Sequence, residues 1–251
     1  RNIIKDNTTY AGAGIFIVGE PVISNNLIYD NSAFIAGGVI MAGGQLRNNT
    51  IVGNDASFQG GSQLGGNVYI IFEPEFPSTH ILNNVICNAT SGGGIIWDGV
   101  LSPDAIQFNN VWNNNPGNYG SADPGTGQFI FDGQADQTGI DGNISQDPSF
   151  VDAQANDYHL QTDSPCINSG DSSLVPAPGE TDIDGESRIY GSRIDMGADE
   201  YVGYVKPVAH AGPDQHLDKP RLITLDGSAS FFYDPCGVME FSWEQVAGSA
   251  V

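Results

Sequence analysis

The sequence predicts an all-β fold built around a three-faced solenoid of stacked coils. Two observations support this prediction: a short motif recurs with a period near 24 residues, and glycine and asparagine are abundant. These residue types suit many short strands separated by turns with left-handed backbone conformations. Three short apolar runs fit into each period, so one period makes one coil. No single coil can bury its inner face, but coils stacked at the strand spacing of about 4.8 Å can.

The repeated motif begins with asparagine and continues with a short apolar run. Its five copies start at Asn2, Asn26, Asn49, Asn84 and Asn110, with steps of 24, 23, 35 and 26 residues. Asparagine tolerates a left-handed corner and can hydrogen-bond the asparagine of the next coil, so we expect these five side chains to form a ladder that satisfies buried amides. Of the 21 asparagines, 18 lie in residues 1–118, which is the predicted extent of the solenoid.

The motif Asn-x-Ile-x-x-Asn, followed by Gly-Gly-Ile, resembles the repeats of pectate-lyase-like proteins. The resemblance covers residues 1–118 and implies a right-handed parallel β-helix of about five coils. A β-sandwich with asparagine-rich turns is the alternative, because such turns use the same residue types.

The strand that follows each glycine-rich turn contains a possible binding surface. If its first and third residues point inward, alternation places Phe16, Ile40, Tyr69 and Ile96 outward in one column. One interpretation makes this column the floor of a carbohydrate-binding groove, because long acidic loops flank it and such loops often carry function. The other interpretation is that loops or residues 119–200 simply cover the column.

Catalytic chemistry has little support in the sequence. Lyases of the family that the motif resembles use a basic side chain to abstract a proton, and residues 1–118 contain only three basic residues. These are Arg1, Lys5 and Arg47, and we expect Arg47 to be a surface charge. The signatures of polygalacturonase-like hydrolases are absent. Glu73, Glu75 and Asp98 remain as weak catalytic candidates, since glycoside hydrolysis needs a pair of carboxylates.

Residues 119–203 contain a series of short blocks whose order resembles the C-terminal module of many secreted or surface-anchored bacterial β-helix proteins. The blocks are Asp147–Asp152, Asp157–Leu160, Ser164–Asp171, and the final stretch from Asp182 to Tyr201. The resemblance implies a bacterial protein located outside the cell or on its surface. It also implies an irregular cap that seals the open end of the solenoid, where core and strand edges would otherwise be exposed.

The cap also contains the candidate metal ligands Asp182, Asp184 and Asp195, for which Ca²⁺ is the candidate cofactor. An Asp-x-Asp-Gly turn can bind calcium, although the third ligand and the closing glutamate of an EF-hand loop are missing. The alternative is that these aspartates pair with Arg188 and Arg193. The three cysteines, at positions 87, 166 and 236, lack metal-binding spacing, and both three buried thiols and one disulfide remain open.

Residues 204–251 resemble the beginning of a PKD domain, an Ig-like module, with Trp243 as the expected core tryptophan. A sandwich of this kind needs about seven strands over ~100 residues. We therefore expect an incomplete domain, which either continues past Val251 or is completed by strands of another chain. The opening at Arg1 in the middle of a repeat likewise suggests a fragment of a longer molecule.

Charge restricts the partners. The chain has 30 acidic and 8 basic residues, a net charge of −22, which excludes nucleic acid and anionic membranes as expected partners. No run of 18 apolar residues is present, so no membrane insertion is expected.

We consider three functions for this chain. The first is a non-catalytic extracellular protein that binds a polysaccharide or cell-surface glycan, mediates adhesion or builds a surface assembly. The second is a polysaccharide lyase or glycoside hydrolase with its active site in the acidic loops or upstream coils. The third is a filament subunit that joins copies of itself end to end.

Overall fold

The computed structural model describes residues 1–60, 64–76, 78–98, 106–122, 129–131, 135–203, 224 and 226–227. The chain divides into two compact units, Arg1–Val202 and Gly203–Val251. Nearly all of the PKD-like segment lies outside the described residues, so its fold and the filament hypothesis stay predictions. None of the helical segments in the described ranges has the length or apolar character of a membrane span.

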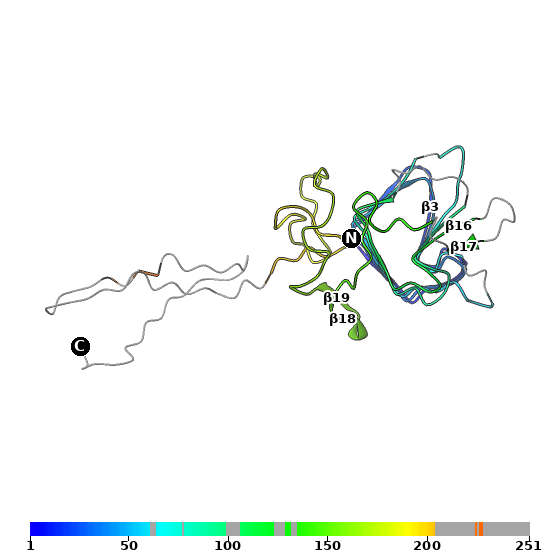
Figure 1. Cartoon of the computed structure of the whole chain (residues 1–251), viewed down its shortest axis with the longest axis horizontal. Helices are drawn as coiled ribbons and strands as arrows, with labels where there is room; N and C mark the ends of the chain where they lie inside the picture. The colour runs from blue at the N-terminus through cyan, green and yellow to red at the C-terminus, as the bar shows by residue number, and fades with distance from the viewer. Residues whose placement is uncertain are drawn as a thin grey trace. The chain divides into compact units, whose positions relative to one another are not determined.

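The first unit is an all-β parallel solenoid of about four turns. Figure 1 looks nearly along the stack, so that successive coils superpose around one outline. The five motif copies thus make about four turns rather than the five coils expected, since five stacked strands are joined by four turns.

Three parallel sheets form the sides of the solenoid. Sheet 1 consists of β1 (Ile3–Lys5), β5 (Leu27–Tyr29), β9 (Thr50–Val52), β12 (Val85–Cys87) and β15 (Asn110–Trp112). Sheet 2 consists of β3 (Ile15–Val18), β7 (Val39–Ala42), β10 (Val68–Ile70), β13 (Ile95–Trp97), β16 (Tyr119–Ala122) and an antiparallel edge strand, β17 (Phe129–Ile130). Sheet 3 consists of β4 (Val22–Ser24), β8 (Gly44–Arg47), β11 (Thr79–Leu82) and β14 (Ile106–Gln107). A further parallel pair joins β2 (Thr8–Ala11) to β6 (Ser32–Ile35).

The core lies inside the three sheets and follows their pleat. Sheet 1 contributes the middle residue of each strand, and sheet 2 contributes the first and third residues, as strand alternation requires. Ile28 and Ile51 of sheet 1, Met41 of sheet 2 and Leu46 of sheet 3 are all fully buried in one cluster. The register that the motif predicts is therefore the register that buries the apolar residues.

Two adjacent asparagines have different roles at the corner before sheet 1. The first asparagine of each pair takes the left-handed conformation, as Asn25, Asn48 and Asn83 do with φ of 58°, 53° and 56°. The second forms the ladder, in which each Nδ2 donates to the Oδ1 of the next coil. The links Asn2–Asn26, Asn26–Asn49 and Asn49–Asn84 are each 3.0 Å long.

The fifth position of the ladder differs from the prediction. Asn84 donates to Asn109 at 2.9 Å, and Asn109 donates to Asn143 at 3.1 Å. Asn110 instead lies in β15 opposite Val85 and bonds the backbone of Gln146. The prediction was wrong by one residue because the corner residue of this coil is Phe108, so the first asparagine of the pair is free to form the ladder.

A second asparagine ladder follows sheet 1 at the next corner, which the sequence reasoning did not identify. Its links are 2.8 to 3.0 Å long and run through Asn7, Asn31, Asn54, Asn67, Asn114 and Asn118. The fourth motif copy has Ala89 where the others have asparagine. Asn67, from a different part of the coil, fills the gap, and the backbone N–H of Ala89 donates to Asn114.

The C-terminal segment, defined as residues 135–203, lies mainly along the side of the solenoid. Its start extends the stack, since Val111 donates to the carbonyl of Ile144 at 3.0 Å. The remainder packs against the outer face of sheet 1, where Tyr158 and Met196 join Val85 and Cys87 in one apolar cluster. The segment thus extends the stack at its start and then covers the outer face of sheet 1, and the expected seal over the open end stays a prediction.

The approach between this segment and sheet 1 is close. A Cβ atom on Gly197 would lie 2.9 Å from Thr50 Oγ1 and 3.0 Å from a methyl group of Val85, and φ there is +106°. Only glycine fits such a position without strain. The segment also contains the antiparallel pair β18 (Phe150–Asp152) and β19 (Asp157–Leu160), joined by the short helix η2 (Ala153–Ala155).

Candidate functional site

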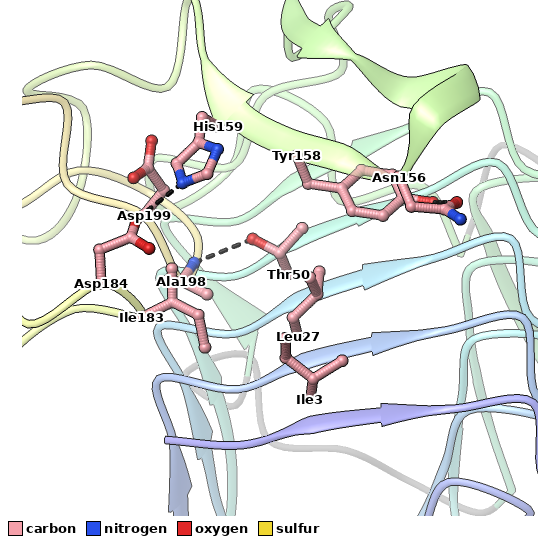
Figure 2. Close-up of a pocket in the computed structure, with 10 residues that line it drawn as sticks. All are labelled: Ile3, Leu27, Thr50, Asn156, Tyr158, His159, Ile183, Asp184, Ala198 and Asp199. Atoms are coloured by element: carbon pink, nitrogen blue, oxygen red, sulfur yellow. Dashed lines mark hydrogen bonds and ion pairs between the residues drawn. The ribbon is translucent and has the colours of Figure 1, made fainter.

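A pocket of about 150 Å³ lies between sheet 1 and the C-terminal segment (Figure 2). Three consecutive strands of the solenoid form one wall, and three separate stretches of the segment form the other. The lining residues are Ile3, Leu27, Thr50, Asn156, Tyr158, His159, Ile183, Asp184, Ala198 and Asp199.

The solenoid wall is a column produced by strand register. Ile3 pairs with Leu27, and Leu27 pairs with Thr50, so their side chains stack on successive strands. Figure 2 shows this column running below the chain that carries Tyr158. Thr50 Oγ1 accepts a hydrogen bond of 2.9 Å from the backbone N–H of Ala198, which fixes the distance between the two walls.

The other wall is held in shape by the turn between β18 and β19. Asp152 caps η2 by accepting from the N–H groups of Gln154 and Ala155, and Asn156 ends the turn in a left-handed conformation with φ of 60°. The Tyr158 hydroxyl donates to Asn156 Oδ1 at 3.1 Å. Because the Tyr158 ring also packs edge-on against Phe150, its position in the pocket wall is fixed.

His159 is the centre of a charged constellation at the pocket. Its Nδ1 contacts Asp157, and its Nε2 lies 2.7 Å from Asp184 Oδ2. Burial alone would lower the pKa of His159, but the hydrogen bonds with both carboxylates outweigh burial and raise it to about 9. The hydrogen bond with His159 lowers the pKa of Asp157. Without another ligand, the ring is an imidazolium held between two carboxylates at neutral pH.

Asp199 completes the constellation from another stretch of chain. Its Oδ2 accepts from the backbone N–H of Leu160 at 2.8 Å. Burial raises the pKa of Asp199 to about 6. Single ligand atoms of His159, Asp184 and Asp199 all lie within 4.8 Å of one another. The sequence reasoning missed two of these three residues, although the spacing of Asp157 and His159 already places both on one face of a strand.

The structure brings two of the three predicted calcium ligands together: one carboxylate oxygen each of Asp182, Asp184 and Glu186 lie within 4.8 Å of one another, and Asp195 is not among them. Buried Asp182 accepts from three consecutive N–H groups, those of residues 184–186, and its other oxygen accepts from Glu200. Asp195 is also buried and accepts from the N–H groups of Asn168 and Tyr201 at 2.6 and 2.7 Å. Within the described ranges, Asp195 belongs to neither group of side chains that fits a metal ion. Asp182 and Asp195 thus stabilise turns through these hydrogen bonds, and Asp184 is the one of the three predicted ligands that lines the pocket. The calcium role stays a prediction.

The alternative prediction, in which these aspartates form ion pairs with Arg188 and Arg193, also differs from the structure. Arg188 is fully buried and donates to the carbonyl oxygens of Asp195, Gly197 and Ala198 at 3.0 to 3.1 Å. The Arg188 guanidinium thus binds three backbone carbonyl groups and, within the described part of the chain, no carboxylate directly. Arg193 is exposed.

The predicted carbohydrate-binding column has the expected register but is mostly covered. Phe16, Ile40, Tyr69 and Ile96 are aligned across β3, β7, β10 and β13. Only Phe16 is exposed, at 58%, whereas Ile40 and Ile96 are at most 1% exposed and Tyr69 is 8% exposed. Leu64, Ile71 and Phe131 pack against the buried members. The carbohydrate-binding role of this column stays a prediction.

The catalytic candidates occupy a loop beside the same sheet. Asp98 accepts from the Tyr69 hydroxyl at 3.2 Å and from the backbone of Phe72, so it anchors the loop. Glu73 and Glu75 are exposed on a turn closed by Phe76. Among the described residues that line the pocket, none is one of these three carboxylates.

The structure also describes Arg47 and two of the three cysteines. Arg47 is not a free surface charge: it is partly buried and pairs with Glu180 at 3.2 Å. The sequence could not reveal this partner, because Glu180 lies 133 residues away. Cys87 and Cys166 are buried free thiols, and Cys236 lies outside the described residues.

Comparisons with protein-family models, curated proteins and solved structures found no match to this chain. The assignment of a parallel β-solenoid therefore rests on the structure itself, and the family resemblances of the sequence stay predictions.

Proposed function

We propose that this chain is a non-catalytic extracellular or cell-surface protein that binds a glycan, with the pocket beside sheet 1 as the position for one sugar unit. The observation that carries the proposal is the composition of that pocket. It combines an aromatic ring, an amide and two carboxylates with an apolar wall.

This combination suits the two kinds of surface on a sugar. Ile3, Leu27 and the Tyr158 ring offer apolar area to the C–H face of a sugar ring, while Asn156 and Asp199 offer groups that hydrogen-bond hydroxyls. Pockets that enclose drug-sized ligands measure about 300–1,000 Å³. A pocket of about 150 Å³ suits a smaller group, such as one unit of a longer glycan.

A binding role accounts for the chemistry better than a catalytic role. A general base must be able to accept a proton near the operating pH. His159, with a pKa raised to about 9 after the carboxylates outweigh burial, is already protonated there. Asp98 is committed to the loop that it anchors, and Glu73 and Glu75 are exposed on a turn.

The proposed setting and ligand class follow from resemblance and charge. The motif resembles pectate-lyase-like repeats, residues 119–203 resemble the cap of secreted bacterial β-helix proteins, and residues 204–251 resemble a PKD domain. All three are typical of proteins outside the cell. The net charge of −22 disfavours polyanionic polysaccharides, so we propose a neutral or amino-sugar glycan as the ligand.

A glycan array probed with the full chain, followed by titration of the best neutral or amino-sugar ligand, tests the proposal. Asn156→Gly removes the pocket amide while keeping a residue that accepts φ of 60°. We expect its affinity to fall at least about tenfold, the effect of one lost hydrogen bond of about 1.4 kcal/mol. Asn113→Gly is the matched control, because Asn113 is also exposed and left-handed, with φ of 51°, but does not line the pocket. Absence of glycan binding, or equal affinity of the two variants, contradicts the proposal.

A further inference from the structure

We infer that His159, Asp184 and Asp199 form a binding site for a divalent transition-metal ion, with Zn²⁺ as the best-fitting example. The three residues come from β19 and from two turns of the C-terminal segment, and Figure 2 shows their side chains facing one another at one end of the pocket. One ligand atom from each lies within 4.8 Å of the others. Zn²⁺ is bound at about 2.0–2.2 Å by imidazole nitrogen and carboxylate oxygen.

The site needs little rearrangement to reach these distances. Asp199 is fixed from behind by the N–H of Leu160, at 2.8 Å, and so presents a carboxylate from a stable position. Asp184 has a side chain that is 44% exposed, so rotation about its bonds adjusts the third ligand. An ion would lie between His159 Nε2 and the two carboxylates, where it replaces the Nε2 proton, released to solvent, and the direct contact of 2.7 Å between His159 and Asp184.

The other face of the imidazole ring supplies an independent argument. Histidines that bind metals usually donate their second ring N–H to a carboxylate or carbonyl, which fixes the tautomer and the orientation of the ring. His159 Nδ1 contacts the Asp157 carboxylate, two residues earlier on the same strand. The ring is therefore already oriented so that Nε2 faces Asp184.

The donor atoms select the class of ion. Ca²⁺ takes six to eight oxygen ligands, whereas a site with one imidazole nitrogen and two carboxylates suits Zn²⁺ and its transition-metal neighbours. Three protein ligands leave at least one coordination position for water or a bound group. Because His159, Asp184 and Asp199 all line the pocket, the ion would lie at the pocket wall. The inference does not depend on glycan binding, since Zn²⁺ alone is the probe.

Titration of the metal-free full chain with Zn²⁺ against a chromophoric chelator tests the site. We expect one tightly bound equivalent. Asp184→Asn and His159→Gln each remove a ligand, and we expect each to weaken binding by about 100-fold or more. Asp157→Asn removes only the group that orients the histidine, and its expected loss is about 10–100-fold. Asp163→Asn, which removes an equal charge from an exposed position of the same segment, should leave affinity unchanged.

The competing account is that the three groups form only a hydrogen-bonded ion pair. That account holds, and the metal site is overturned, when the wild-type chain binds no stoichiometric Zn²⁺ or when His159→Gln binds it as tightly as Asp163→Asn. Asp184→Asn keeps the test decisive if the histidine variant does not fold, because Asp184 has a substantially exposed side chain. Anomalous scattering at the zinc edge should place the ion beside His159 Nε2, and a peak confined to other positions contradicts the inference.

Discussion

The solenoid and the C-terminal segment satisfy their buried polar groups in opposite ways. In the solenoid, one solution is copied from coil to coil, as when Asn26, Asn49 and Asn84 repeat the same hydrogen bonds at the same corner. In the segment, each buried polar group has its own arrangement: Asp182 accepts four backbone N–H groups, and Arg188 donates to three carbonyls. The ladder distributes its stability over many equivalent residues, whereas the segment concentrates it in a few.

The largest expected effect follows from this concentration. Arg188→Met keeps a long apolar side chain but removes three hydrogen bonds to carbonyl oxygens, of which, among the described residues, only that of Ala198 keeps another donor, the N–H of Ile183, and it removes the charge that Glu200 and Asp182 stabilise. Loss of one partner from a buried charged network costs about 3–5 kcal/mol. Chemical denaturation should show this loss, and Arg193→Gln at an exposed position should change the free energy of unfolding by less than about 0.5 kcal/mol. Equal effects of the two variants would remove the contrast between the regions.

A smaller effect is expected inside the ladder. Asn49→Ala removes the donor to Asn84 and the acceptor for Asn26, both of them buried. An unsatisfied buried group costs about 1–3 kcal/mol, so we expect a loss of that size in the free energy of unfolding. Asn2→Ala, at the exposed end of the same ladder, should cost less than about 1 kcal/mol. If the end variant loses as much as the middle variant, burial is not the source of the ladder's stability.

The third expected effect is the pH dependence that Asp195 contributes to the stability of the segment. Burial raises the pKa of Asp195 to about 6, although hydrogen bonds from Asn168 and Tyr201 act against it. The unfolded chain therefore releases this proton first, near pH 4, and stability falls as pH rises from about 4 through 6. Glu180 acts in the opposite direction: burial would raise its pKa, but hydrogen bonds from Ala177 and Asn25 lower it. Burial also raises the pKa of Asp199 to about 6 and that of Glu200 to about 8, so both groups act in the same direction as Asp195.

Melting temperatures at pH 4.5 and pH 7 isolate the Asp195 contribution. Asp195→Asn removes the titrating group, so the difference in melting temperature between the two pH values should change from that of the wild type in favour of the higher pH. An unchanged difference would mean that Asp195 has the same pKa in the folded and unfolded chains.

The same contrast explains what could be predicted from the sequence. Repetition made the solenoid visible, because five weak motif copies share one register. The repeat gave the wrong ladder residue at Asn110, because two adjacent asparagines left the register ambiguous. It also gave no sign of Asn67, which enters the second ladder from outside the motif. The sequence did not decide whether Ile40 and Tyr69 are covered, because this depends on how the loops fold back over sheet 2.

The pocket was the least predictable part of the molecule. His159 and Asp184 are 25 residues apart, and Thr50 and Ala198 are 148 residues apart, so only tertiary packing brings them together. A single local signal existed, the shared strand face of Asp157 and His159. The composition of the segment distinguishes it from the coils in the sequence, but its position along sheet 1 could not be predicted.

That position is the central claim, because the pocket exists only if the segment lies along the solenoid. A double-mutant cycle between Arg47 and Glu180 tests it most directly, since this ion pair joins β8 to the segment through side chains that are 19% and 10% exposed. With Arg47→Met, Glu180→Gln and the double variant, we expect a coupling free energy of about 1 kcal/mol or more in chemical denaturation. Effects that add within about 0.3–0.5 kcal/mol would contradict the account, because they would mean that the two side chains do not meet.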